Sequence, residues 1–355
     1  MLKDYSWKIS ISGAARCSRR LGLTALLLPA ALSAHVKWFC FYDVTKPTKP
    51  LLAVINANFL SVLGVFVALL FLVFCVDDWV AKRWPRFESQ NSAFADAQEK
   101  LVRLGVGAFF LCTWNIGLNI LTPELHTQSA WMFVVQFVTA MATAWKRTCI
   151  GAALGIGVLY AYGVSQYGFF HMLDYVYFLG LAAYLAFTSL PSQRLLQLRT
   201  PVMTACLAFS LMWTAIEKLL YPQWSQQLMT KHGHMMMGMK FDIFIVIAAF
   251  VEFTLSFYLA TGRGMLRLGA LALLIVFVSA MPEFGPVDVV GHFPLIAILG
   301  VPFLAGDSSL QRFWRLPQFG TAVNAAATCV LYIVTLAVLL SLYHGVQWLE
   351  YHSSS

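Results

Sequence analysis

Glu252 is the carboxylate best placed to exchange protons inside an apolar segment. About ten residues separate it from Asp242 on one side and from Arg263 on the other. At that depth of a membrane a carboxylate costs several kcal/mol unless it is paired, protonated or hydrated. Lys218 could reach Glu252 and pair with it. The structural alternatives are a protonated Glu252 hydrogen-bonded between helices and a Lys218 that extends to the membrane surface. The functional interpretation is a proton-exchanging pair.

Two further pairs combine an imidazole with a carboxylate at helical spacing. His171 precedes Asp174 by three residues, and Asp288 precedes His292 by four. Side chains at these spacings share one face of a helix. Such a pair can hold a chosen imidazole tautomer and relay a proton, or it can ligate a metal. The alternative is that the two acids stabilise helix starts.

The segment HGHMMMGMK (232–240) combines imidazoles with thioethers. These ligand types suit Cu(I), and the scarcity of carboxylates disfavours Mg²⁺ and Ca²⁺. Copper binding is therefore one hypothesis, and an apolar re-entrant or interfacial segment is the other. The candidate metal ligands are His232, His234, Met235, Met236, Met237 and Met239.

The composition predicts a membrane protein that is all-α. The chain is 59% hydrophobic and 11% charged, with a mean hydropathy of +0.72. Soluble proteins carry roughly 25% charged residues. The net charge of +8 does not indicate nucleic-acid binding, because Lys and Arg lie in short loops between apolar stretches. We expect a polytopic protein in the lipid bilayer with about eleven spans, at about 21–42, 51–76, 104–121, 129–145, 149–166, 172–190, 201–220, 240–261, 265–281, 290–305 and 321–343.

Basic clusters fall on alternate loops of this arrangement. They predict an N-terminus inside and a C-terminus outside, as in a bacterial inner membrane. Lysines at 37, 46, 49, 231 and 240 are exceptions on the outer side. The first span could also be a cleaved signal peptide. Every histidine is expected at the outer side, namely His35, His126, His171, His232, His234, His292, His344 and His352.

The middle of the chain contains an internal repeat. FLCTWNIGLNILTPEL (110–125) aligns with FSLMWTAIEKLLYPQW (209–224), so Trp114 corresponds to Trp213. Further along, Gln136 corresponds to Glu252 and Gly168 to Gly285. Four spans in each half predict two parallel four-helix repeats. We expect repeats at 101–200 and 201–306, flanked by 1–100 with two spans and by 307–355 with the last span. The pseudo-symmetric ligand pocket would be lined by Trp114, Asn115, Asn119, Gln136 and Trp213.

The second repeat resembles the DoxX/DoxD family of four-helix membrane proteins. The supporting segments are LMWTAIEKLLYP (211–222), AAFVEFTLSFYLATGR (248–263), LGALALLIVFVSA (268–280) and DVVGHFPLIAILG (288–300). The resemblance implies quinone-linked redox chemistry at the outer side, with a redox partner protein to supply electrons. It leaves open whether the chain is a membrane subunit of a quinone-dependent oxidoreductase. Two alternatives remain, copper handling by the His/Met-rich segment and proton-coupled transport of a small solute through Glu252.

Overall fold

The computed structural model describes residues 36–84, 94–117, 119–306, 310 and 319–352. Within these ranges the chain is helical and contains no β-strand, only an isolated antiparallel bridge between Asn119 and His126. The all-α prediction is therefore confirmed for the described residues.

The long helices are connected by short turns and by small helices. The long helices are α2 (Ala57–Arg83), α3 (Ala95–Ile116), α4 (Trp131–Ala142), α5 (Cys149–Tyr167), α7 (Val176–Ser189), α8 (Gln193–Leu220), α10 (Phe241–Thr261), α11 (Leu266–Phe284), α12 (Pro286–Ala305) and α13 (Thr321–Tyr351). The short ones are η1 (Val36–Trp38), α1 (Leu51–Val54), η4 (Lys146–Thr148), α6 (Phe169–Met172), η5 (Leu173–Tyr175), α9 (Pro222–Lys231) and η6 (Gly233–Met236).

Local sequence sets several of these boundaries. Asn56 begins α2 by accepting a hydrogen bond from the Phe59 N–H at 3.1 Å. Pro222 occupies the first turn of α9, where its missing N–H costs nothing. Gly168 and Gly285 stand between two helices at φ of 85° and 79°, a backbone conformation that residues with a Cβ rarely adopt.

Within the described residues, eight helices are long and apolar enough to cross a membrane. The structure therefore confirms a multi-pass helical protein but does not reach the expected eleven spans. The first expected span lies mostly outside the described residues, and its last residues, after Trp38, are not helical. The expected span at 129–145 corresponds to α4, which has only 12 residues. The expected span at 104–121 ends early, because Gly117 stops α3 after Ile116.

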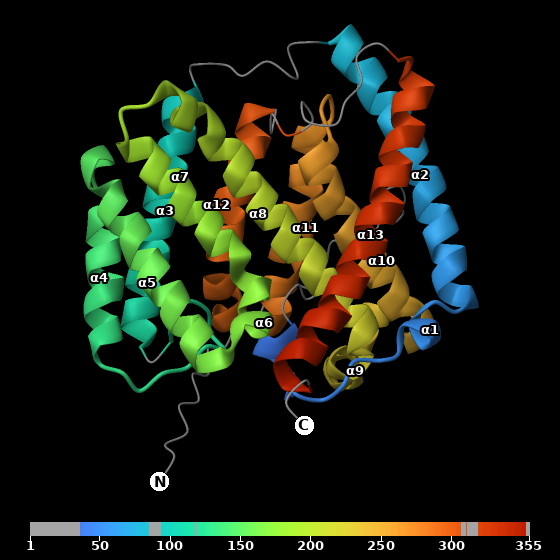
Figure 1. The fold of residues 1–355 in the computed structure, drawn as a ribbon, viewed down its shortest axis with the longest axis horizontal. Helices are drawn as coiled ribbons and strands as arrows, with labels where there is room; N and C mark the ends of the chain where they lie inside the picture. The colour runs from blue at the N-terminus through green and yellow to red at the C-terminus, as the bar shows by residue number, and fades with distance from the viewer. Residues whose placement is uncertain (1–35, 85–93, 118, 307–309, 311–318, 353–355) are drawn as a thin grey trace, which may run out of the picture.

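The helices that follow α2 form a closed ring. Neighbours in the chain pack against each other in the order α3, α4, α5, α7, α8, α10, α11 and α12, and α12 packs back against α3. Helices α2 and α13 pack against each other outside this ring, next to α8 and α10, on the right of Figure 1. A carboxylate or lysine that points into the ring is thereby separated from lipid by helices.

The two ends of the bundle carry different ionisable side chains. Helices α5, α8, α11 and α13 finish at the lower end of Figure 1, and the described histidines belong to the later turns of α13 or to segments that join helices at this end, including the start of α12. We call this the histidine end. Most described Lys and Arg side chains lie toward the opposite end, which we call the basic end. Basic clusters on alternate loops predict that most Lys and Arg residues gather at one end of the bundle, and the described residues follow this pattern.

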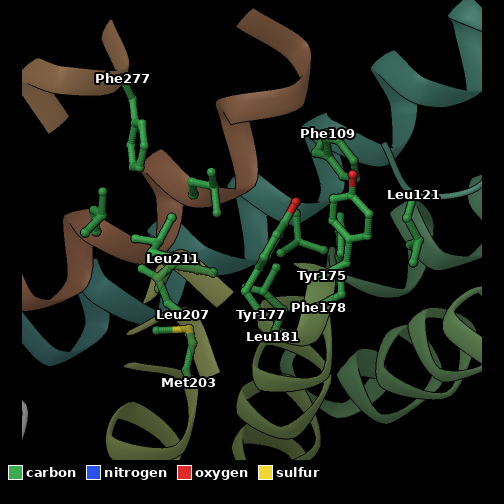
Figure 2. Close-up of a cluster of buried hydrophobic side chains, with 14 of the residues drawn as sticks. Phe109, Leu121, Tyr175, Tyr177, Phe178, Leu181, Met203, Leu207, Leu211 and Phe277 are labelled. Atoms are coloured by element: carbon green, nitrogen blue, oxygen red, sulfur yellow. The ribbon is translucent and has the colours of Figure 1, made fainter. Parts of the chain in front are cut away.

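Apolar and aromatic side chains fill the interface between α7 and α8. Figure 2 shows Tyr177 and Leu181 of α7 facing Met203, Leu207 and Leu211 of α8. Gly180 of α7 lies so close to α8 that an added Cβ would come within 2.7 Å of the Cys206 side chain. Close packing of this kind stabilises helix pairs in lipid, where the hydrophobic effect does not.

Candidate functional site

Lys218 and Glu252 form the ion pair that the sequence predicts. Lys218 of α8 donates to Glu252 of α10, and Thr214 donates to the other carboxylate oxygen at 3.2 Å. Both partners are almost fully buried. At about 1.5 Å per residue, Glu252 lies about 16 Å along α10 from the histidine end, whereas Lys218 is only one turn from the end of α8. The lysine side chain therefore reaches inward to a carboxylate near mid-membrane.

His292 of α12 pairs with Asp288, one turn earlier on the same helix. Its Nδ1 atom lies 3.1 Å from Asp288 Oδ1 and 3.0 Å from the Asp288 carbonyl oxygen. The imidazole stacks on Phe277 and contacts Trp38, with ring centroids 5.1 and 5.0 Å apart. The His292 and Asp288 side chains are completely buried near the start of α12. The predicted pair is present, inside the bundle rather than at its surface.

Asp174 and Glu217 both pair with one lysine, Lys37. The Lys37 Nζ atom lies 2.6 Å from Asp174 Oδ2 and 2.6 Å from Glu217 Oε2. Tyr343 of α13 donates to Glu217 Oε2 at 3.0 Å. Helical spacing alone suggests that Asp174 pairs with His171. In the structure Asp174 pairs instead with Lys37, which comes from a distant part of the chain.

His171 pairs instead with Glu124, a residue that the sequence does not single out. His171 Nε2 lies 3.0 Å from Glu124 Oε1, which also accepts a hydrogen bond from Tyr175. Burial alone would raise the pKa of Glu124, but the contacts with His171, Lys37 and Tyr175 outweigh it and hold that pKa below its usual value. Glu124 follows Pro123 in the loop between α3 and α4. The signal in the sequence was its charge, because this loop holds no other Asp, Glu, Lys or Arg.

A segment that is helical only in η1 covers these groups at the histidine end. We call residues 36–49 the N-terminal strap. Trp38 contacts His292, and Tyr42 stacks on His171 with ring centroids 5.5 Å apart. Sequence reasoning missed the strap, because it assigned residues 36–42 to the first span and treated Lys37 as an exception to the charge rule.

Hydrogen bonds fasten the strap to α13 and to the junction between α8 and α9. Tyr221 donates to the Lys46 carbonyl at 2.7 Å, and Gln347 of α13 donates to the same carbonyl at 3.0 Å. Thr48 lies 2.5 Å from His344 Nδ1. The strap is therefore an ordered part of the site.

Together these groups form one buried assembly, which we call the polar cluster. Within the described residues it holds five carboxylates, two lysines and two imidazoles, so carboxylates outnumber lysines by three. Burying unpaired carboxylates in a low-dielectric interior is costly. Protons or cations must therefore balance part of this charge. The members are Lys37, Glu124, His171, Asp174, Glu217, Lys218, Glu252, Asp288 and His292.

The candidates in the first half divide between the interior and the surface. Gln136 is buried and donates to the backbone carbonyl of Asn119 at 2.5 Å. Trp114 and Asn115 are exposed on the outside of the bundle instead of lining a pocket. Trp213 is buried against Tyr343 and Phe170, beside the polar cluster.

The His/Met-rich segment lies at the rim of the histidine end. His232 Nδ1 and His234 Nε2 lie 2.5 and 3.5 Å from the two oxygens of Glu283. Met235 packs into the core, whereas Met237 is exposed. Among the described residues, no group of three or more His, Cys, Asp or Glu side chains could hold a metal ion. Copper binding through the thioethers stays a prediction.

An apolar groove lies on the other side of the α8–α10 interface. Its empty volume is about 160 Å³. Its walls belong to the same turns of α8 and α10 that carry Lys218 and Glu252, with one side chain from α13. The lining residues are Ala215, Ile216, Leu219, Ala249, Phe250, Phe253 and Leu336.

Comparison with protein-family models, curated proteins and solved structures finds no match to this chain. The functional argument therefore depends on the chemistry of the polar cluster and the groove.

Proposed function

We propose that the chain is a membrane protein that binds a quinone-like lipid at the α8–α10 interface and exchanges protons with it through Glu252 and Lys218. The observation that carries the proposal is the position of this buried ion pair. It lies on the inner side of a helix interface whose other side is an apolar groove. A lipid-borne ligand with a polar ring needs such a combination of apolar walls and a proton donor.

The residues present fit a quinone-like group in two respects. The groove has only apolar and aromatic walls, and no water-sized sphere fits inside it, so a ring or an isoprenoid chain would enter only where these side chains move apart. The Lys218 ammonium can donate to a carbonyl oxygen, and Glu252 can accept or release a proton. When bound, a quinone would supply two-electron, two-proton chemistry, with the electrons delivered by a partner protein.

The rest of the polar cluster can connect Glu252 with water at the histidine end. His292 contacts Asp288, and the Trp38 ring lies 5.0 Å from the imidazole ring. An imidazole can accept a proton at one ring nitrogen and release one from the other, so His292 can relay a proton between the carboxylates and the histidine end. We propose that this end faces outward in a bacterial inner membrane, with the basic end inside.

The same proposal includes two DoxX-like repeats, α3 to α7 and α8 to α12. Gly168 and Gly285 end corresponding helices in the same backbone conformation. Gln136 binds the backbone of Asn119, and Glu252 binds Lys218 at the corresponding position. These equivalences support a pseudo-two-fold arrangement in which only the second half carries an ionisable pair at this position.

Decylubiquinone binding to the full chain in lipid nanodiscs tests the proposal. We expect saturable binding, and we expect Glu252→Gln to weaken it at least tenfold, because a neutral amide cannot exchange the proton or form an ion pair with Lys218. Glu283→Gln is the matched control, since Glu283 is a carboxylate of the same end outside the polar cluster. Equal affinity in Glu252→Gln and the parent protein would refute the role of the ion pair. Absence of any saturable binding would refute the ligand class.

A further inference from the structure

We infer that Asp174, Glu217 and Trp224 form an ammonium-binding site, in which Lys37 is a tethered occupant and which accepts a small alkylammonium ion in its place. This site is separate from the α8–α10 groove and does not depend on the ligand proposed there.

The surroundings of the Lys37 ammonium have the composition of an amine-recognition site. Two carboxylate oxygens lie at 2.6 Å, one from Asp174 and one from Glu217. The rings of Trp224 and Tyr42 complete the enclosure, with centroids 5.4 and 5.7 Å from Nζ. Charge-assisted hydrogen bonds and aromatic faces together favour an organic ammonium ion over a neutral ligand.

The bundle supplies most of this site without the strap. Asp174 comes from η5, Glu217 from α8 and Trp224 from α9. Tyr343 of α13 holds Glu217 by donating to it at 3.0 Å. The strap contributes only Lys37 and one of the two rings. The binding groups therefore stay in position on helices when the lysine is removed.

The buried carboxylates at this place need a cation or protons to balance their charge. Among the described residues, removal of Lys37 would leave the His171 imidazole as the basic partner of Glu124 and no ion pair to Asp174 or Glu217. Within the described part of the chain, Asp174 Oδ1 and Glu124 Oε2 are buried and accept no hydrogen bond. Carboxylates so placed destabilise the fold unless a cation or protons neutralise them.

Chemical rescue of Lys37→Ala tests the inference. The substitution leaves a space that n-propylamine, protonated at neutral pH, matches in length and charge. We expect the Tm of the full chain in detergent to fall by about 5 °C or more. Propylammonium should restore most of this loss with a saturable dose response, and 1-propanol, a neutral molecule of similar size, should not. Lys46→Ala, at an exposed strap lysine, is the matched control and should show neither effect.

Two results would overturn the inference. One is a Lys37→Ala protein as stable as the parent, and the other is a destabilised protein that propylammonium does not rescue better than propanol. Where Lys37→Ala cannot be purified alone, recovery of folded protein only in buffers with propylammonium supports the site, and failure in both buffers overturns it. Adding Asp174→Asn to Lys37→Ala should weaken propylammonium binding at least tenfold. Decylubiquinone binding, measured on the same proteins, separates this outcome from that of the proposed function.

Discussion

Removing either member of the Lys218–Glu252 pair should cost different amounts of stability, although the two side chains share one contact. Lys218→Met leaves a carboxylate about 16 Å from the helix end, with Thr214 as its remaining hydrogen-bond donor. The cheapest response is to take up a proton. A carboxyl group with an ordinary pKa of about 4.3 does so at pH 7 at a cost of about 3.7 kcal/mol.

Glu252→Gln leaves a lysine with an easier alternative. Lys218 is buried, and the amide oxygen introduced at position 252 can still accept a hydrogen bond from its ammonium. We expect this variant to lose about 1.5–3 kcal/mol, the contribution of a hydrogen bond to a charged group. The two substitutions should therefore rank in a fixed order at neutral pH.

The pH dependence provides the sharper check. The cost of Lys218→Met should shrink by about 1.4 kcal/mol for each pH unit below 7, to about 1 kcal/mol at pH 5, because protonation becomes easier. Glu252→Gln should show no comparable trend. Reversible unfolding in mixed micelles at several pH values measures both free energies. A Lys218→Met cost that does not change with pH, or a larger cost for Glu252→Gln at pH 7, would refute the reasoning.

Three further predictions concern the strap, the basic end and the first half. Gly291→Ala should displace the strap, because an added Cβ would lie 2.2 Å from the Trp38 ring, and proteolysis near residue 41 should become several-fold faster than in Gly345→Ala, where nothing lies within 4 Å. Asp77→Ala should cost about 1–3 kcal/mol in denaturant unfolding, because Asp77 accepts from Tyr258 and from the backbone N–H of Met265 at 2.8 Å. Glu124 has a lowered pKa, so its contribution to stability is present above the ordinary glutamate pKa and lost as the pH falls through the lower folded value. Glu124→Gln should remove that acid loss, and an unchanged acid limb in its unfolding curve would contradict the assignment.

The long apolar segments of the sequence were sufficient to predict the helical membrane fold. The position of Glu252 in the middle of one of these segments was sufficient to predict its contact with Lys218. A carboxylate in the middle of an apolar helix must find a partner, and a lysine one turn from the end of the preceding long helix is within reach. The His292–Asp288 pair was predictable for a similar reason, since both lie on one helix.

Contacts made by segments outside the long helices were not predictable in this way. Lys37, Glu124 and Tyr42 lie in segments with no periodic pattern, and each reaches a partner more than a hundred residues away or in another loop. Asp174 and His171 satisfy helical spacing, yet each has a stronger partner from outside its own helix. The pairing therefore depends on tertiary structure that spacing does not encode.

The closed ring has a consequence for assembly. Its two halves meet at one junction where the chain passes directly from α7 to α8, and at a second where α12 and α3 touch without a peptide link. There an added Cβ on Gly105 would lie 2.7 Å from the Ala297 side chain, much as Gly180 approaches α8 at the first junction. A half expressed alone would leave both of these close-fitting faces uncovered. Two fragments divided between α7 and α8 would therefore each carry two close-fitting faces through which they could reassemble in a bilayer.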